Sequence, residues 1–237
     1  MTHLLNASAS TARLHLARVD AIDVGALDWL TEAERTRHAG MASDDRRRSF
    51  LAGHWLARQL GAESHGVEVT RVEVHALGDG RPCLHVDGTR SPLSISLSHS
   101  GGWILAGIAS SPIGVDIEVP RRPRDIMPLA RYAFSPEEAA RIAALPDAAR
   151  VGAFHELWAL KEARGKQSGE GFLPGVARRS CTQRTDDARA QAVSWRLGEG
   201  GAVAVALDHG AALEVEDASP LFARRYWRYQ AASSATD

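Results

Sequence analysis

The chain has 237 residues, enough for one large domain or for two small domains that share a cleft. Its composition is that of an ordinary soluble protein, with 44% hydrophobic and 24% charged residues. Lys and Arg together number 28 and Asp and Glu 29, so the net charge is −1. This balance argues against a general nucleic-acid binder, which usually carries a clear basic excess.

Two cysteines, Cys83 and Cys181, lie far apart in the sequence and lack the close spacing of a zinc site. We expect them to be free thiols in a reducing compartment. No window approaches 18 consecutive apolar residues, and the N-terminus lacks a charged-then-apolar signal pattern. The sequence therefore predicts a cytoplasmic protein that does not contact a membrane.

The apolar pattern of the first half predicts one strand, two helices and then a series of strands. The first strand is expected at residues 13–18, and a helix begins near Thr31. A second helix follows Asp44 and is expected to stop at Gly61, because glycine commonly ends helices. The later strands are predicted at residues 67–76, 83–86, 94–98 and 103–109.

The second half repeats this mixture of elements. A strand at residues 113–119 is followed by helices at 136–145 and 148–166 and by strands at 192–197, 202–207 and 213–215. A boundary at 110–112 divides the chain into residues 1–111 and 112–237. Interleaved helices and mostly antiparallel strands predict an α+β fold. The weak similarity of residues 50–55 to residues 154–158 suggests a duplication, although two aromatic-rich helices would look alike without one.

An acidic pair lies on the strand predicted at residues 113–119. Because side chains alternate along a strand, Asp116 and Glu118 share one face, about 7 Å apart at Cα. Their oxygens can converge on Mg²⁺, which favours one or two carboxylates together with substrate phosphates. The alternative is a half-exposed strand whose polar face is solvated.

The helix at residues 148–166 carries a second polar group. Trp158, Glu162 and Lys166 recur every four residues and share a face, whereas Lys161 lies about 100° round the helix. Glu162 could complete a metal site while the lysines meet phosphate. The alternative is a Glu–Lys pair on a surface helix, although a tryptophan on the same face favours a half-buried setting.

Three further segments have the composition of anion-binding sites. Residues 94–102 end an alternating strand in a turn whose backbone amides, hydroxyls and imidazole can surround a phosphate. Taken alone, such a histidine is more often structural or on the surface, an arginine cluster is most often a solvated face, and the arginine of the turn could simply be solvated. The residues concerned are Ser98 and His99, Arg81 in the turn at 80–82, and the cluster Arg46, Arg47 and Arg48.

In their order, these motifs resemble the Sfp-type 4′-phosphopantetheinyl transferases. The acidic strand and the helix with Trp158, Lys161-Glu162-Ala163 and Lys166, at this separation, are the most specific part of the resemblance. The supporting segments are residues 46–53, 80–84, 96–100 and 169–172.

The resemblance implies a fold of two similar α/β halves related by a pseudo-two-fold duplication, with coenzyme A in the cleft between them. It also implies a holo-[acyl-carrier-protein] synthase type of activity. In this reaction the 4′-phosphopantetheine group of coenzyme A moves to a serine of an apo carrier protein, and adenosine 3′,5′-bisphosphate is released.

The resemblance further implies a role for each site residue. Asp116, Glu118 and Glu162 would bind Mg²⁺, with Mn²⁺ as an alternative, and Glu162 would deprotonate the serine directly or through water. Lys161 would take part in catalysis and, with Lys166, meet the pyrophosphate or pantetheine part of coenzyme A. The other contacts to coenzyme A would come from Arg47, Arg48, Arg81, Ser98 and His99.

Two positions depart from the family pattern. The arginine that usually stands four residues before Gly53 is replaced by Ser49, so the sequence leaves open whether Arg47 or Arg48 takes its role. Arg81 stands where lysine is common, which keeps the charge but alters reach and geometry.

The partners implied are acidic acyl, peptidyl or aryl carrier proteins, without nucleic acid or membrane. We expect a monomer, and a basic docking surface formed by Arg121, Arg122, Arg124, Arg131 and Phe134; the alternative is a solvated basic loop. Two other functions stay open, a non-catalytic coenzyme A-binding regulator and a Mg²⁺-dependent nuclease. The neutral net charge disfavours the nuclease.

Overall fold

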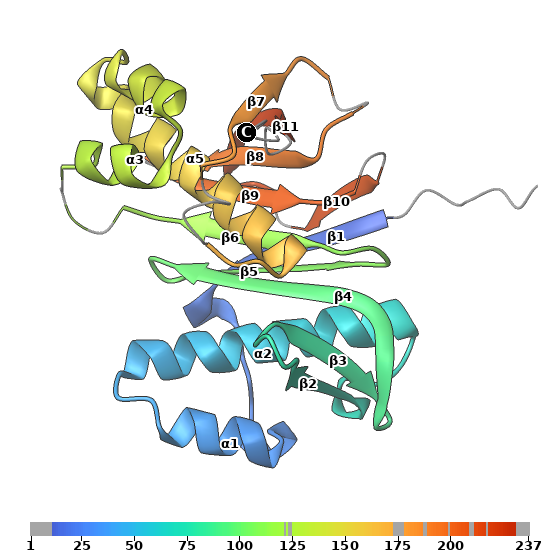
Figure 1. Ribbon diagram of the computed structural model, residues 1–237. Coiled ribbons are helices and arrows are strands. Elements are labelled where there is room, and N and C mark those ends of the chain that lie inside the picture. Colours follow the sequence, from blue (N-terminus) through green and yellow to red (C-terminus); the bar gives the residue numbers. More distant parts are fainter. Residues whose placement is uncertain are drawn as a thin grey trace, which may run out of the picture.

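The computed structural model describes residues 11–120, 122, 125–172, 178–186, 189–198, 200–208, 211–216 and 218–230. Two β-sheets and five α-helices make up this part of the chain, which confirms the predicted α+β class (Figure 1). The helices are α1 (Glu32–Ala39), α2 (Asp44–His65), α3 (Met127–Ala133), α4 (Pro136–Ala143) and α5 (Asp147–Ser168). None of the described helices combines the length and apolar character that a membrane crossing needs.

The two sheets each carry one long helix. The first sheet has the order β10 (Ala212–Glu216), β1 (Thr11–Arg18), β5 (Trp103–Ala109), β4 (Thr89–Ser100), β3 (Pro82–Val86) and β2 (Val72–Ala76). The second has the order β6 (Gly114–Glu118), β9 (Gly201–Ala206), β8 (Ala192–Leu197), β11 (Leu221–Tyr229) and β7 (Cys181–Arg184). Helix α2 packs on the first sheet and α5 on the second.

The strand order is similar in the two halves. In each half the first strand pairs antiparallel with the second strand of a hairpin, giving β1-β5-β4 in one sheet and β6-β9-β8 in the other. The exception is β10, which follows the predicted boundary at 110–112 but pairs parallel with β1 in the first sheet. The C-terminal half therefore contributes a strand to the N-terminal sheet.

The prediction that the second helix stops at Gly61 is wrong. Helix α2 continues to His65 and ends before Gly66, whose φ of 64° is the left-handed conformation that glycine adopts readily. Gly61 instead permits close packing, because a Cβ there would lie 2.9 Å from Leu84 Cδ1 and 3.1 Å from Val72 Cγ1. The glycine brings the helix against the sheet rather than ending it.

Among the α-helices and strands, α3, β7 and β11 were not predicted, and residues 69–71 form a 3-10 turn instead of strand. Helix α3 has only seven residues, too few for a clear helical period. In β11 the pairing register shifts between Phe222 and Arg225, so apolar and polar residues do not alternate along it.

A row of serines joins the two sheets. Strand β6 is an edge strand of its sheet, and its outward N–H groups would lack partners there. Every second residue of β4 supplies a hydroxyl for them. Ser94, Ser96, Ser98 and Ser100 accept from Ile113, Val115, Ile117 and Val119 at 3.3, 3.0, 3.4 and 3.1 Å. Side chains of one sheet thus complete the backbone hydrogen bonding of the other.

This serine row predicts a position-dependent loss of stability. Ser96→Ala would leave the buried N–H of Val115 without an acceptor and should lower the free energy of unfolding by about 1–3 kcal/mol. Ser94→Ala is the control, since its bond is only partly buried and water can replace the hydroxyl. Urea denaturation of both variants would measure the difference, and equal losses would contradict the role of burial.

Candidate active site

The acidic strand faces α5. A Cβ on Gly114 would lie 1.9 Å from the carbonyl oxygen of Ala163, so this face of β6 lies directly against the helix backbone. Asp116 and Glu118 share that face because side chains alternate, while Val115 and Ile117 enter the core between the sheets. Asp116 is only 4% exposed. The alternative of a solvated polar face therefore does not hold for Asp116.

The two oxygens of Asp116 differ in their surroundings. Oδ1 accepts hydrogen bonds from Ser98 Oγ and Lys166 Nζ, each at 2.7 Å. Oδ2 is buried and has no hydrogen-bond partner among the described residues. Such an oxygen is costly to bury unless a donor or a cation meets it.

Glu162 and Lys166 complete the group. Lys166 Nζ also donates to the carbonyl of Val115 at 3.0 Å, which fixes its ammonium group at the strand. Burial, and next the negative charge of Asp116, raise the pKa of Glu162, although Lys166 acts in the opposite direction. Burial likewise raises the pKa of Asp116, against the influence of Lys166 and Ser98. Two carboxyl groups thus compete for one ammonium group, an arrangement that favours a further cation.

The residues present fit a hard divalent cation. The unpartnered Oδ2 of Asp116 and the half-buried carboxylates of Glu118 and Glu162 are oxygen ligands of the kind that Mg²⁺ and Mn²⁺ prefer. In the described part of the chain, however, no three His, Cys, Asp or Glu side chains already stand together as a metal site. The three-carboxylate site thus stays a prediction.

Lys161 does not lie beside Asp116 and Lys166. Its side chain is 2% exposed and its Nζ is 2.9 Å from Glu138 Oε2 and 2.8 Å from the carbonyl oxygen of Arg179. The structure brings Ser98, Asp116 and Lys166 into contact and Glu162 beside them, but it does not bring Lys161 to them. Direct contact between Lys161 and a ligand would require this buried pair to open.

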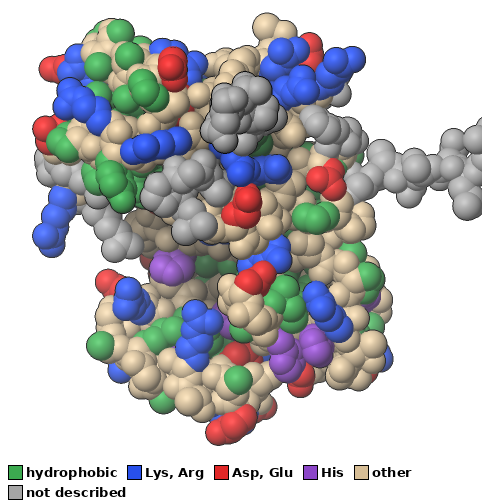
Figure 2. Space-filling model, viewed as in Figure 1, with side chains coloured by type: hydrophobic (Ala, Val, Ile, Leu, Met, Phe, Trp, Pro, Cys, Tyr) green, Lys and Arg blue, Asp and Glu red, His purple; other side chains and the backbone are tan. Residues whose placement is uncertain are grey.

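Two cavities flank the turn at residues 80–82. The first, of about 740 Å³, lies between the two halves, where Arg81, Arg90 and Lys166 contribute positive charge. The second, of about 700 Å³, lies between α1, α2 and β4. Gly80, Pro82 and Leu97 line both. Figure 2 shows Lys and Arg side chains on both halves of this face, with a histidine in the indentation between them.

Arg81 connects the halves. Its guanidinium lies 2.7 Å from Asp79, and Nη1 donates to the carbonyl of Gln167, near the end of α5, at 3.4 Å. A Cβ on Gly169 would lie 2.8 Å from Arg81 Cζ, and the φ of 78° at this residue also favours glycine. The turn at 80–82 is therefore held against the C-terminal end of α5, above the first cavity.

The second cavity shows which residues at the start of α2 face inward near Ser49. Arg46, Ser49, Phe50 and Gly53 line it, at the spacing of one helix face. Arg47 and Arg48 do not line either cavity, and instead pair with Asp44 and Asp45 at 2.7 Å. His99 lines the same cavity. The sequence analysis placed Arg46 in the basic cluster but considered only Arg47 and Arg48 for this role, although the three-residue and seven-residue spacing of Arg46 to Ser49 and Gly53 was a usable signal.

Glu34 fixes the wall of this cavity. Its carboxylate accepts from Arg58 at 2.6 and 2.8 Å and from the N–H of Thr31 at 2.7 Å, and His54 Nδ1 lies 2.6 Å from it. Burial by itself raises the pKa of Glu34, but the hydrogen bonds from His54, Arg58 and Thr31 lower it to about 2. The carboxylate thus stays charged at neutral pH and ties α1 to α2.

Comparison with known proteins matches the region that carries this site. The family model described as the 4′-phosphopantetheinyl transferase superfamily matches residues 112–216. A 4′-phosphopantetheinyl transferase of Bacillus subtilis is 30% identical over 122 residues, 52% of each chain. The 4′-phosphopantetheinyl transferase HetI of Nostoc sp. is 31% identical over 155 residues, 65% of each chain. The chain thus spans between half and two thirds of the length of these relatives.

A holo-[acyl-carrier-protein] synthase of Streptococcus agalactiae is 30% identical over 84 residues, which are 33% of this chain and 71% of that protein. The resemblance found in the sequence is therefore confirmed, and the acidic strand β6 and helix α5 lie within the matched residues 112–216. The chain belongs to the 4′-phosphopantetheinyl transferase superfamily.

Proposed function

We propose that the protein transfers the 4′-phosphopantetheine group of coenzyme A to a serine of an apo carrier protein. The observation that carries the proposal is the buried Asp116, whose Oδ2 has no partner among the described residues, beside Glu162, Lys166 and a cavity with a basic lining. The relatives named 4′-phosphopantetheinyl transferases favour this function over a non-catalytic binder or a nuclease.

Coenzyme A is a long ligand with two phosphorylated parts, and the two cavities offer it a matching path. Arg81, Arg90 and Lys166 in the first cavity, and Arg37 and Arg46 in the second, supply positive charge for its phosphates. His99 lines the second cavity, whereas Ser98 would act by donating a hydrogen bond to Asp116. In this proposal, Arg37 and Arg46 make the phosphate contacts that the sequence analysis expected of Arg47 and Arg48.

Asp116, Glu118 and Glu162 would hold Mg²⁺, with Mn²⁺ as the alternative. When bound, the cation would neutralise the negative charge of the pyrophosphate. The Oδ2 atom of Asp116 is the most specific support for this ligand set, because it is buried and no group in the described part of the chain donates to it.

The chain's own residues then account for the chemistry. Glu162, whose raised pKa suits a general base, accepts the proton of the carrier serine directly or through water. The serine oxygen forms a bond to the β-phosphorus, and the bond from that phosphorus to the bridging oxygen breaks. Adenosine 3′,5′-bisphosphate leaves with the bond's electron pair. Lys166 stabilises the charge that develops on the phosphate oxygens.

The carrier would dock near α3. Arg122 and Arg131 are exposed there, and Tyr132 is 65% exposed, so this surface is basic with an aromatic centre. Phe134 is only 1% exposed and packs in the core, so its predicted role in docking is wrong. Arg121 and Arg124 lie outside the described residues. The protein would act as a cytoplasmic monomer, and its carrier protein would be acidic.

The reaction predicts a mass change that intact-mass spectrometry can measure. With coenzyme A and Mg²⁺, one of a panel of apo carrier proteins should gain one phosphopantetheine, and EDTA should abolish the gain. Glu162→Ala and Asp116→Asn should also abolish it, whereas Asp147→Asn, an exposed charge loss on the same helix, should not. Coenzyme A binding without any gain on any carrier would instead support a non-catalytic binder.

The second cavity predicts which arginine holds coenzyme A. Arg46→Met should raise the KM for coenzyme A about tenfold or more, because losing a hydrogen bond to a charged group costs about 1.5–3 kcal/mol. Arg47→Met is the matched control, since its side chain pairs with Asp44 outside both cavities. Steady-state kinetics would compare the two, and a larger effect at Arg47 would refute the assignment.

The docking surface predicts a selective effect on the carrier. Arg122→Glu and Arg131→Glu should raise the apparent KM for the carrier, since each places a negative charge before an acidic partner, and leave the KM for coenzyme A unchanged. Raising the ionic strength should weaken the wild-type interaction in the same direction. Equal changes in both KM values would rule out this surface.

A further inference from the structure

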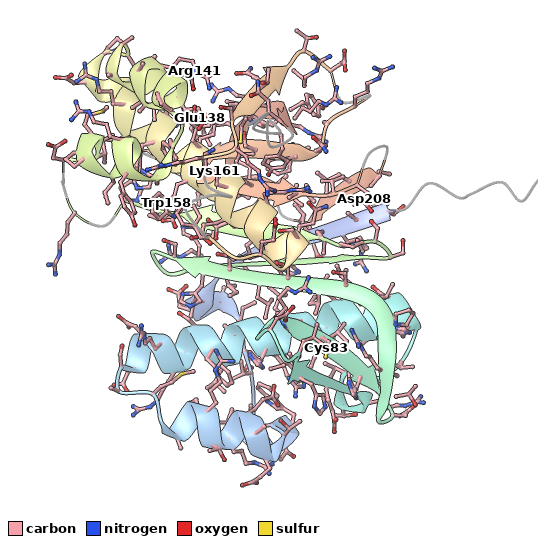
Figure 3. All side chains as sticks on the ribbon, viewed as in Figure 1. Cys83, Glu138, Arg141, Trp158, Lys161 and Asp208 are labelled. Atoms are coloured by element: carbon pink, nitrogen blue, oxygen red, sulfur yellow. The ribbon has the colours of Figure 1, made fainter. Side chains whose placement is uncertain are left out.

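A buried ion pair fixes α5 on a different side from Asp116. Glu138 is 0% exposed, and Lys161 Nζ lies 2.9 and 3.2 Å from its two carboxylate oxygens (Figure 3). Lys161 lies about 140° round the helix from Lys166. Burying two charges is costly, and a well-packed apolar pair is often as stable, so stability alone does not account for this arrangement.

Glu138 gathers donors from three segments of the chain. It accepts from the N–H of Ser135 at the start of α4 at 3.1 Å, and from the N–H of Cys181 at the start of β7 at 2.7 Å. The third donor is Lys161, which also donates to the carbonyl of Arg179 at 2.8 Å. The pair therefore ties α4, α5 and β7 together at one point, and it fixes the rotation of α5 about its axis.

That rotation decides where Glu162 points. Adjacent helix residues lie about 100° apart, so the direction of Lys161 sets the direction of Glu162. Lys166, one turn after Glu162 on the same face, contacts Asp116 at 2.7 Å. The helix is thus held at two points, by Asp116 on one side and by Glu138 on the other, and Glu162 lies between them.

We propose that Glu138 is a positioning residue that, through Lys161, sets Glu162 against Asp116. Lys161 then acts through its ion pair and does not contact coenzyme A. The inference rests on the proposed function in one respect, since the role of Glu162 as base and cation ligand belongs to that function.

Three variants test it: Glu138→Gln, Lys161→Met and the two combined. The readouts are Mn²⁺ affinity by electron paramagnetic resonance in the presence of coenzyme A, kcat, and the KM for coenzyme A. Each single variant should lower Mn²⁺ affinity and kcat by about 10- to 100-fold, as losing the support of a metal ligand does. The KM for coenzyme A should not change. The double variant leaves no charge unpaired and should lose less than the two single losses combined.

Glu137→Gln, an exposed neighbour on α4, is the control and should match the wild type. Should the single variants fail to fold, Lys161→Arg carries the same test, because it keeps the charge and alters its reach. Its expected result is lower Mn²⁺ affinity at an unchanged KM for coenzyme A.

Two outcomes would overturn the positioning role. One is unchanged Mn²⁺ affinity in the folded variants. The other is a raised KM for coenzyme A in Lys161→Met that the double variant does not relieve, which would assign Lys161 a direct contact. A wild type that transfers nothing, while the variants still weaken Mn²⁺ binding, would refute the transferase but not the positioning.

Discussion

The hydrogen bonding of strand β6 is the constraint on which the rest of the structure depends. In the described part of the chain no strand pairs with its outward N–H groups through backbone hydrogen bonds, and side-chain hydroxyls of alternate residues of β4 accept from them instead. On its helix side, Lys166 and Gln167 donate to the carbonyls of Val115 and Pro112. One strand is thereby joined to a sheet, to the other sheet and to a helix, and Asp116 lies where all three meet.

The contacts of β6 determine the orientation of the Asp116 carboxylate, its burial and the raised pKa values of Asp116 and Glu162. Ser98, which accepts from the N–H of Ile117, also donates to Asp116, so the contact that joins the sheets also orients the carboxylate. Gly114 lets α5 approach the strand backbone, and this closeness buries Asp116 and brings Glu162 beside it. The raised pKa values of both carboxyl groups follow from that burial. The contacts that pack α5 and the two sheets together therefore also set the electrostatics of the site.

Ion pairs away from Asp116 also fix the helices around the site. The pair of Glu138 and Lys161 fixes α5 against α4 and β7, and the pair of Glu34 and Arg58 fixes α1 against α2 at the second cavity. Both are buried ion pairs whose hydrogen bonds link the elements that they join. Arg81 spans the halves beside the first cavity. Ion-paired residues thus line both cavities, Asp79 and Arg81 in the first and Glu34 in the second.

The sequence by itself determined the mixed fold, most strands and helices, and the family, because these depend on local periodicity and on motif order. The pairing of Asp116 with Lys166, fifty residues later, and the burial of Lys161 depend on how α5 packs, which no local pattern encodes. Gly61 was mistaken for a helix end because its use lies in contact with a distant strand. Similarly, Arg46 rather than Arg47 lines the cavity because the rotation of α2 on its sheet decides which face looks inward.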